Sequence, residues 1–122
     1  MAAVQQLQAT IDRIRSAECS GDELLNALRH PSPVVRANAV ERLGQPGPVQ
    51  HALAIESLEF TARDPASEYR LMGTITLAHL TVAALMRLGG EAGQRGLALI
   101  AGWPEPDREG LVWFLRSERL LT

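Results

Sequence analysis

The hydrophobic positions of the chain recur every three or four residues, which is the spacing of one face of an α-helix. The first segment shows this spacing in four apolar positions: Val4, Leu7, Ile11 and Ile14. Runs in which apolar and polar residues alternate between hairpin turns are absent from the sequence, so strands are not predicted. The pattern therefore predicts an all-α protein of about seven helices.

Helix start and stop signals divide the chain at short intervals. Ser20 and Glu23 have the spacing of a capping box, in which each side chain bonds the other residue's backbone N–H. Ser32 and Pro33 predict another start, because proline costs no hydrogen bond at the first helical position. Gly44 predicts the end of that helix. Four later starts are expected, at Pro48, at Asp64 with Pro65, at Glu91, and at Glu105 with Pro106.

The segment 66–88 allows two interpretations. One long helix fits its length, whereas a break near 73–76 would divide it in two. Its second half is apolar on nearly all sides, which predicts a buried, central helix. His79 lies within this half, and we expect it to be a hydrogen-bonded core residue. The alternative for His79 is a role as a pH switch or as a ligand.

A turn motif occurs twice in the chain, with an offset of 34 residues. The matching residues are Arg29 and Arg63, Pro31 and Pro65, and Arg36 and Arg70. A weaker third copy begins at Gly102. Residues 24–44, which contain the first copy, resemble a HEAT repeat of the short bacterial, phycobilin-lyase-like kind. The resemblance is closest at 33–36, at Ala39 and at Leu43 with Gly44.

The resemblance implies a right-handed α-solenoid of about three HEAT-like helical hairpins in one domain, 1–122. A single hairpin cannot bury both of its apolar faces, so hairpins of this kind stack and share a core. The expected parts are an N-terminal capping helix at 1–19 and repeats at 20–45, 48–88 and 91–122. The second helices of the repeats would line one concave face, and they are expected at 33–44, 66–88 and 106–120.

Composition and charge exclude several classes of protein. The 122 residues carry a net charge of −2, and the 12 basic residues are all Arg, spread evenly among 14 acidic ones. A basic stripe for nucleic acid is therefore not expected. The sequence contains no stretch of 18 apolar residues, so no membrane helix is predicted. Because the first residues lack the cationic and apolar regions of a secretory signal, we expect a cytoplasmic protein.

The sequence offers no catalytic or metal-binding constellation. One Cys and three scattered His lack the spacing of zinc ligands, and no cofactor is implied. We expect Cys19 to be a small buried residue, because no His lies near it in the sequence to activate its thiol. Glu56 and Glu59 share a helix face, and we expect them to be solvated or to contact Arg63 rather than to act as acid and base. We therefore expect a protein that is not an enzyme.

The leading interpretation is a non-catalytic protein–protein interaction module, an adaptor or regulator that binds a protein partner on a helical-repeat surface. The candidate partner-binding residues are Asn38, Glu41, Arg42, Arg70, Arg108 and Trp113. Arg36 is expected to hydrogen-bond carbonyl groups of the helix turn or a carboxylate, with an acidic partner as the alternative. The five apolar residues 111–115 cannot all face one core. Exposed members would mark a surface for a partner or for a homo-oligomer formed through this C-terminal segment.

Three other functions stay open. The resemblance implies a phycobilin-lyase-like chaperone or enzyme acting on a pigment-protein, although such repeats serve many unrelated functions. An inhibitor or immunity-type protein would use the same balanced surface to bind one enzyme. A DNA binder would give a salt-sensitive shift on duplex DNA.

Overall fold

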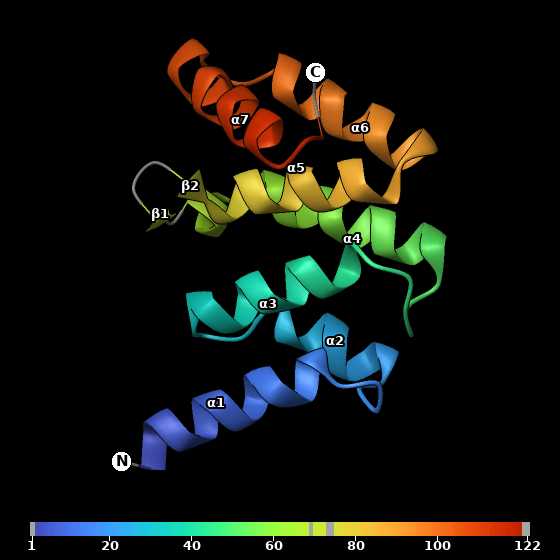
Figure 1. Ribbon diagram of the computed structural model, residues 1–122, viewed down its shortest axis with the longest axis vertical. Coiled ribbons are helices and arrows are strands. Elements are labelled where there is room, and N and C mark those ends of the chain that lie inside the picture. Colours follow the sequence, from blue (N-terminus) through green and yellow to red (C-terminus); the bar gives the residue numbers. More distant parts are fainter. Residues whose placement is uncertain (1, 69, 73–74, 121–122) are drawn as a thin grey trace.

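The computed structural model describes residues 2–68, 70–72 and 75–120 (Figure 1). Over these residues the chain forms seven α-helices, as the hydrophobic pattern predicts. They are α1 (Ala2–Arg15), α2 (Gly21–Ala27), α3 (Pro33–Leu43), α4 (His51–Arg63), α5 (Leu77–Leu88), α6 (Gly90–Ala101) and α7 (Glu105–Ser117). A 3-10 turn, η1 (Pro65–Glu68), and two short strands, β1 (Arg70–Met72) and β2 (Ile75–Thr76), lie between α4 and α5. No described helix is both long enough and apolar enough to cross a membrane.

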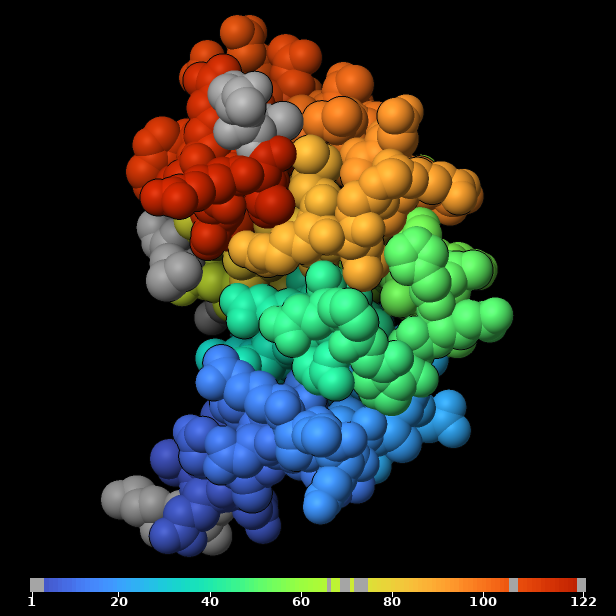
Figure 2. All heavy atoms as spheres, turned by 45° about the vertical axis from the view of Figure 1, so that its right-hand side comes forward, coloured from blue at the N-terminus to red at the C-terminus, as the bar shows by residue number. Residues whose placement is uncertain are grey.

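The helices follow one another in chain order along the long axis of the molecule (Figures 1 and 2). α1 lies at one end and packs on α2 and α3, while α6 and α7 lie at the other end and pack on α5. In the middle, α5 packs on α3, α4 and α6. One continuous hydrophobic core therefore runs through the whole stack.

The central position of α5 confirms the prediction made from its apolar sequence. All nine residues from 77 to 85 are buried. Small residues let its neighbours approach closely: a Cβ added at Gly44 would lie 3.0 Å from the Cα and the Cβ of Ala84. Gly96 of α6 similarly faces Leu85. A helix that is apolar on every side is stable only when other elements cover each side, and here three helices do so.

The predicted capping box of α2 forms as local chemistry requires. The Ser20 hydroxyl accepts a hydrogen bond from the Glu23 backbone N–H at 3.1 Å, and the Glu23 carboxylate accepts from the Ser20 backbone N–H at 3.4 Å. α3 starts at Pro33, but the Ser32 hydroxyl makes no capping bond. α7 starts at Glu105 as expected. Two starts differ slightly from the prediction, because α4 begins at His51 and α6 at Gly90.

The segment 66–88 differs from both interpretations of its sequence. It begins in η1, continues through an antiparallel pairing of β1 and β2, and becomes α-helical only at Leu77. The expectation that no strands form was wrong here. Two strands of two and three residues are too short to show an alternating pattern, and the β-branched Ile75 and Thr76 favour extended backbone. The expected break near 73–76 falls partly outside the described residues, and Thr76 is the residue that caps α5.

The start of α5 gives His79 a structural role. The Thr76 hydroxyl accepts from the His79 backbone N–H at 3.2 Å, and His79 Nδ1 accepts from the Thr76 backbone N–H at 2.9 Å. The histidine thus closes a capping box, a place where glutamate is usual. The buried ring of His79 also packs against Trp103, with 5.6 Å between ring centroids. The prediction of a hydrogen-bonded core histidine is confirmed.

Candidate functional site

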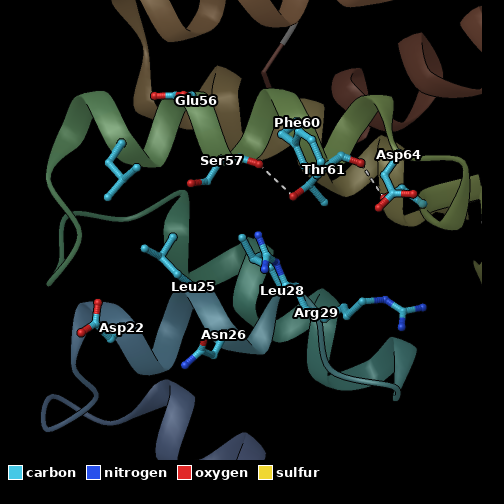
Figure 3. Close-up of a pocket in the computed structure, with 13 residues that line it drawn as sticks. Asp22, Leu25, Asn26, Leu28, Arg29, Glu56, Ser57, Phe60, Thr61 and Asp64 are labelled. Atoms are coloured by element: carbon cyan, nitrogen blue, oxygen red, sulfur yellow. Dashed lines mark hydrogen bonds between the residues drawn. The ribbon is translucent and has the colours of Figure 1, made fainter.

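A groove with a volume of about 590 Å³ lies between α2 and α4, and Figure 3 shows these two helices facing each other across it. We call it the α2–α4 groove. Its apolar walls are Leu25 and Leu28 on the α2 side, and Leu53 and Phe60 on α4. Arg36 of α3 also lines it. The groove is a concave surface of the kind that binds ligands or peptide segments.

The groove forms because α4 carries two apolar stripes. One stripe packs into the core and consists of Ala54, Ile55, Leu58 and Ala62. The second contains Leu53 and Phe60, which are two helical turns apart and 42% and 70% exposed. In the same way, α2 buries Leu24 in the core and leaves Leu25 half-buried at the groove. Each helix therefore offers the groove a face that its own packing does not use.

Arg36 connects the groove to the turn between α2 and α3. Its Nη1 donates hydrogen bonds to the carbonyl oxygens of His30 at 2.7 Å and Pro31 at 3.2 Å. The prediction that this arginine bonds turn carbonyls is confirmed. Its Nε is buried and has no hydrogen-bond partner among the described residues. The guanidinium thus holds the end of α2 in place and keeps a positive charge beside the groove.

Charged residues surround the apolar walls of the groove. Asp22 and Arg29 lie on the α2 side, and Glu56 and Asp64 lie on the α4 side (Figure 3). Glu59 points elsewhere, because it pairs with Arg95 of α6 and with Arg63. The predicted contact between Glu59 and Arg63 is therefore confirmed. The rim carries both signs of charge, so it favours a partner with a specific charge pattern over any anion or cation.

The capping box of α2 is strengthened by an ion pair with α1. Arg13 Nε and Nη2 each donate to a Glu23 carboxylate oxygen at 2.8 Å. This bidentate pair and the Ser20 bonds lower the pKa of Glu23 from its ordinary 4.5 to about 2. The same pair raises the pKa of Arg13. The wall that α2 contributes to the groove is consequently anchored by charge as well as by core packing.

A second concave surface lies on α7, with a volume of about 450 Å³. We call it the α7 face. It consists of Glu105, Arg108, Glu109, Val112, Trp113 and Arg116, with Ile100 of α6 at its edge. Trp113 is 67% exposed, and Val112 is half-buried. Residues 111–115 are therefore divided between core and surface, as their number requires, and the largest of them lies on the surface.

The six candidate residues from the sequence lie in different places. Asn38 is buried: its Oδ1 accepts from Arg15 Nε at 2.7 Å, and its Nδ2 donates to the Val34 carbonyl at 2.8 Å. Arg42 donates to the Pro46 carbonyl at 3.1 Å, in the turn that follows α3. Glu41 is exposed on α3.

The other three candidates lie toward the C-terminus. The structure brings Arg108 and Trp113 together on the α7 face. The side chain of Arg70 lies outside the described residues. The sequence analysis had placed the segment 66–88 in the middle of a concave face. This prediction was wrong for α5, because neighbouring helices cover it and it is not accessible.

Sequence reasoning missed the α2–α4 groove. Its signal was present in α4, where Leu53 and Phe60 are out of phase with the core stripe. A large aromatic residue at an off-stripe position indicates a surface that contacts something else. The prediction placed the binding face on the segments 33–44, 66–88 and 106–120, and the groove lies mainly between α2 and α4.

Cys19 is buried, as predicted, and burial raises the pKa of its thiol. The described residues include no group of three His, Cys, Asp or Glu side chains that could hold a metal ion.

Comparisons of this chain with models of known protein families, with curated proteins and with solved structures found no match.

Proposed function

We propose that the protein is a non-catalytic interaction module, an adaptor or regulator, that holds a segment of a protein partner in the α2–α4 groove. The observation that carries the proposal is the pair Leu53 and Phe60, which expose large apolar side chains along one wall of a concave surface. Such exposure is costly in water and is typical of a surface that a partner covers.

The geometry of the groove favours an amphipathic helical segment as the occupant. Leu53 and Phe60 are seven residues apart, which is about 10 Å along the axis of α4. A helix lying alongside would match them with apolar residues at i, i+3 or i+4, and i+7. Arg36 beside the groove and Arg29 at its rim favour an acidic residue at one end of that segment.

The proposal includes the architecture that the HEAT-like resemblance implies. In it, α1 is a cap, and the hairpins α2–α3, α4–α5 and α6–α7 are three stacked repeats. Two observations support this division: the helices stack in chain order, and Arg36 bonds the turn inside the first hairpin. The groove would then lie between the first helices of two neighbouring repeats, where a solenoid exposes a continuous surface.

Site-specific photocrosslinking in the producing cells tests the proposal. A photoreactive phenylalanine analogue at position 60 is expected to capture one defined protein, and the same analogue at Val4 is expected to capture none. Val4 is a matched control because it is also a largely exposed apolar residue, at 66%. The captured protein should then bind the purified chain, and Phe60→Ser should weaken that binding at least tenfold, whereas Val4→Ser should not.

Two results would contradict the proposal. One is capture of the same set of proteins from positions 60 and 4. The other is a captured protein whose affinity does not change with Phe60→Ser.

The volume of the groove favours a second candidate, binding of a pigment by a phycobilin-lyase-like chaperone. A volume of about 590 Å³ lies within the usual range for small-molecule sites. A titration with free bilin distinguishes the two functions. A pigment site would change the visible absorption of the bilin in the wild type and not in Phe60→Ser, and a peptide groove would leave it unchanged.

A further inference from the structure

The α7 face is an exposed aromatic surface whose charges have no partner in the described part of the chain. None of the ion pairs among described residues includes Glu105, Arg108, Glu109 or Arg116. They surround Trp113, one of the most exposed large hydrophobic side chains of the molecule. A surface with one large aromatic residue and several charges that make no ion pair within the described chain favours a partner with complementary charges.

The order of these residues along α7 is self-complementary. Three pairs have the same midpoint, between positions 110 and 111: Glu105 with Arg116, Arg108 with Trp113, and Glu109 with Val112. When two identical helices pack antiparallel about a two-fold axis at that midpoint, each residue lies level with the other member of its pair along the helix axes. Glu105 then meets an Arg116 once on each side of the axis, and the two copies of Trp113 lie on the same flank of the helix pair.

The chemistry of each opposed pair is favourable. Glu105 and Arg116 form a carboxylate–guanidinium pair. The two Trp113 side chains lie about 7–8 Å apart along the helix axes on one flank, so each ring covers part of the other. Glu109 and Val112 lie next to the axis, where the methylene groups of the glutamate contact the valine. Arg108 lies on the other flank, because Arg108 and Trp113 project to opposite sides of the stripe and the two-fold axis leaves each flank on its own side.

We propose that the α7 face pairs with the α7 face of a second copy of this chain, in an antiparallel, two-fold symmetric dimer. This surface is separate from the α2–α4 groove, and the proposal does not depend on the function of that groove. The contact involves essentially one helix from each copy, so the dimer is weak and depends on concentration. Its ion pairs lie at the surface, so salt weakens it further.

Sedimentation velocity of the full chain, over a wide range of concentration and at low and high salt, tests the proposal. The wild type is expected to change from monomer to dimer as its concentration rises. Glu105→Arg places two arginines opposite each other and should weaken the dimer at least tenfold, and Arg116→Glu should do the same with two glutamates. The double variant Glu105→Arg with Arg116→Glu restores opposite charges and should restore the dimer.

Controls separate this dimer from effects on folding or on other surfaces. Circular dichroism should show the same helix content in all variants, and Glu41→Arg, an exposed change on α3, should leave the dimer intact. Val112→Cys should form an intermolecular disulfide readily, because position 112 lies next to the axis. Ser117→Cys lies on the same helix but far from the axis, and it should not.

Three outcomes would overturn the proposal. The first is a wild type that stays monomeric at every concentration. The second is a dimer that is indifferent to the single charge reversals. The third is a dimer that the single reversals abolish and the double variant fails to restore, because this would mean that Glu105 and Arg116 do not face each other across a two-fold axis.

Discussion

The α2–α4 groove and the α7 face both expose one large aromatic residue among charges, yet their surroundings differ. Phe60 lies on a wall that faces a second helix, and the charges of the rim come from both sides of the groove. Trp113 lies on a single helix whose charges are arranged symmetrically about one midpoint. In both proposals an exposed aromatic residue marks the contact surface, while the arrangement of its neighbours indicates the partner. The first surface favours a different chain, and the second favours an identical one.

Loss of core packing should disable both surfaces together, and it is the largest effect we expect. Leu85 of α5 is fully buried at the centre of the stack. Leu85→Ala should lower the free energy of unfolding by about 2–5 kcal/mol, from lost burial and the remaining cavity. Urea denaturation measures this change. Leu97→Ala, at an exposed position of α6, is the matched control and should change stability by less than about 0.5 kcal/mol.

Loss of the Arg36 guanidinium should affect the groove and not the α7 face. Arg36→Met retains much of the side chain's volume but leaves the His30 and Pro31 carbonyls without their donor. We expect about 1–3 kcal/mol of destabilisation in urea, the usual cost of a broken part-buried hydrogen bond to a charged group. The dimerisation constant should stay at the wild-type value. A parallel loss of dimer would show that the two surfaces are coupled through the stack.

Acid should weaken the ion pair between Glu23 and Arg13 that anchors α2. The resulting loss of stability should be smaller than that expected for Leu85→Ala or Arg36→Met. Because the folded pKa of Glu23 lies at about 2, below its ordinary 4.5, its ion pair stabilises the fold above pH 4.5. That stabilisation is lost as the pH falls from 4.5 towards 2. Glu23→Gln should therefore be less stable than the wild type at pH 7, and the difference should disappear near pH 2. Denaturation midpoints across this range measure it.

The size of this acid effect is limited by exposure. Both side chains of the pair are more than 40% exposed, so added salt should reduce the difference between Glu23→Gln and the wild type. Glu18→Gln is the control, because Glu18 lies 3.4 Å from Arg13 and is 84% exposed. A pH dependence equal to that of Glu23→Gln would contradict the role given to Glu23.

Removal of either exposed aromatic residue should have the smallest effect on stability. Phe60→Ala and Trp113→Ala should each change the free energy of unfolding of the monomer by less than about 0.5 kcal/mol, because neither side chain contributes to the core. Their effects on binding should separate completely. Phe60→Ala should weaken binding of the partner in the groove and leave the dimerisation constant unchanged. Trp113→Ala should weaken the dimer and leave partner binding unchanged. Equal effects of both variants on both assays would mean that the two surfaces are one.

Local signals in the amino-acid sequence were sufficient to predict the starts of α2, α3 and α7 and the central place of α5, but not the turn and strands that follow Asp64. Ser20 with Glu23 and Pro33 act within about one helical turn, so their effect does not depend on the rest of the fold. Residues 77–85 are apolar on every side, which allows only a buried helix. The same reasoning correctly expected Arg36 to bond the turn and residues 111–115 to be divided between core and surface.

Contacts between distant segments decided the rest. Whether Phe60 is covered depends on how far α4 lies from α2, and that distance follows from how both helices pack on α3 and α5. The described residues between α4 and α5 form a 3-10 turn and a strand pair, in which Ser67 donates a 2.6 Å hydrogen bond to the Thr61 carbonyl and β1 pairs with β2. Helix caps involve neighbours in the chain and can be read from the sequence. The exposure of a side chain and the pairing of strands depend on residues that only folding brings together. They therefore cannot be predicted from a single sequence.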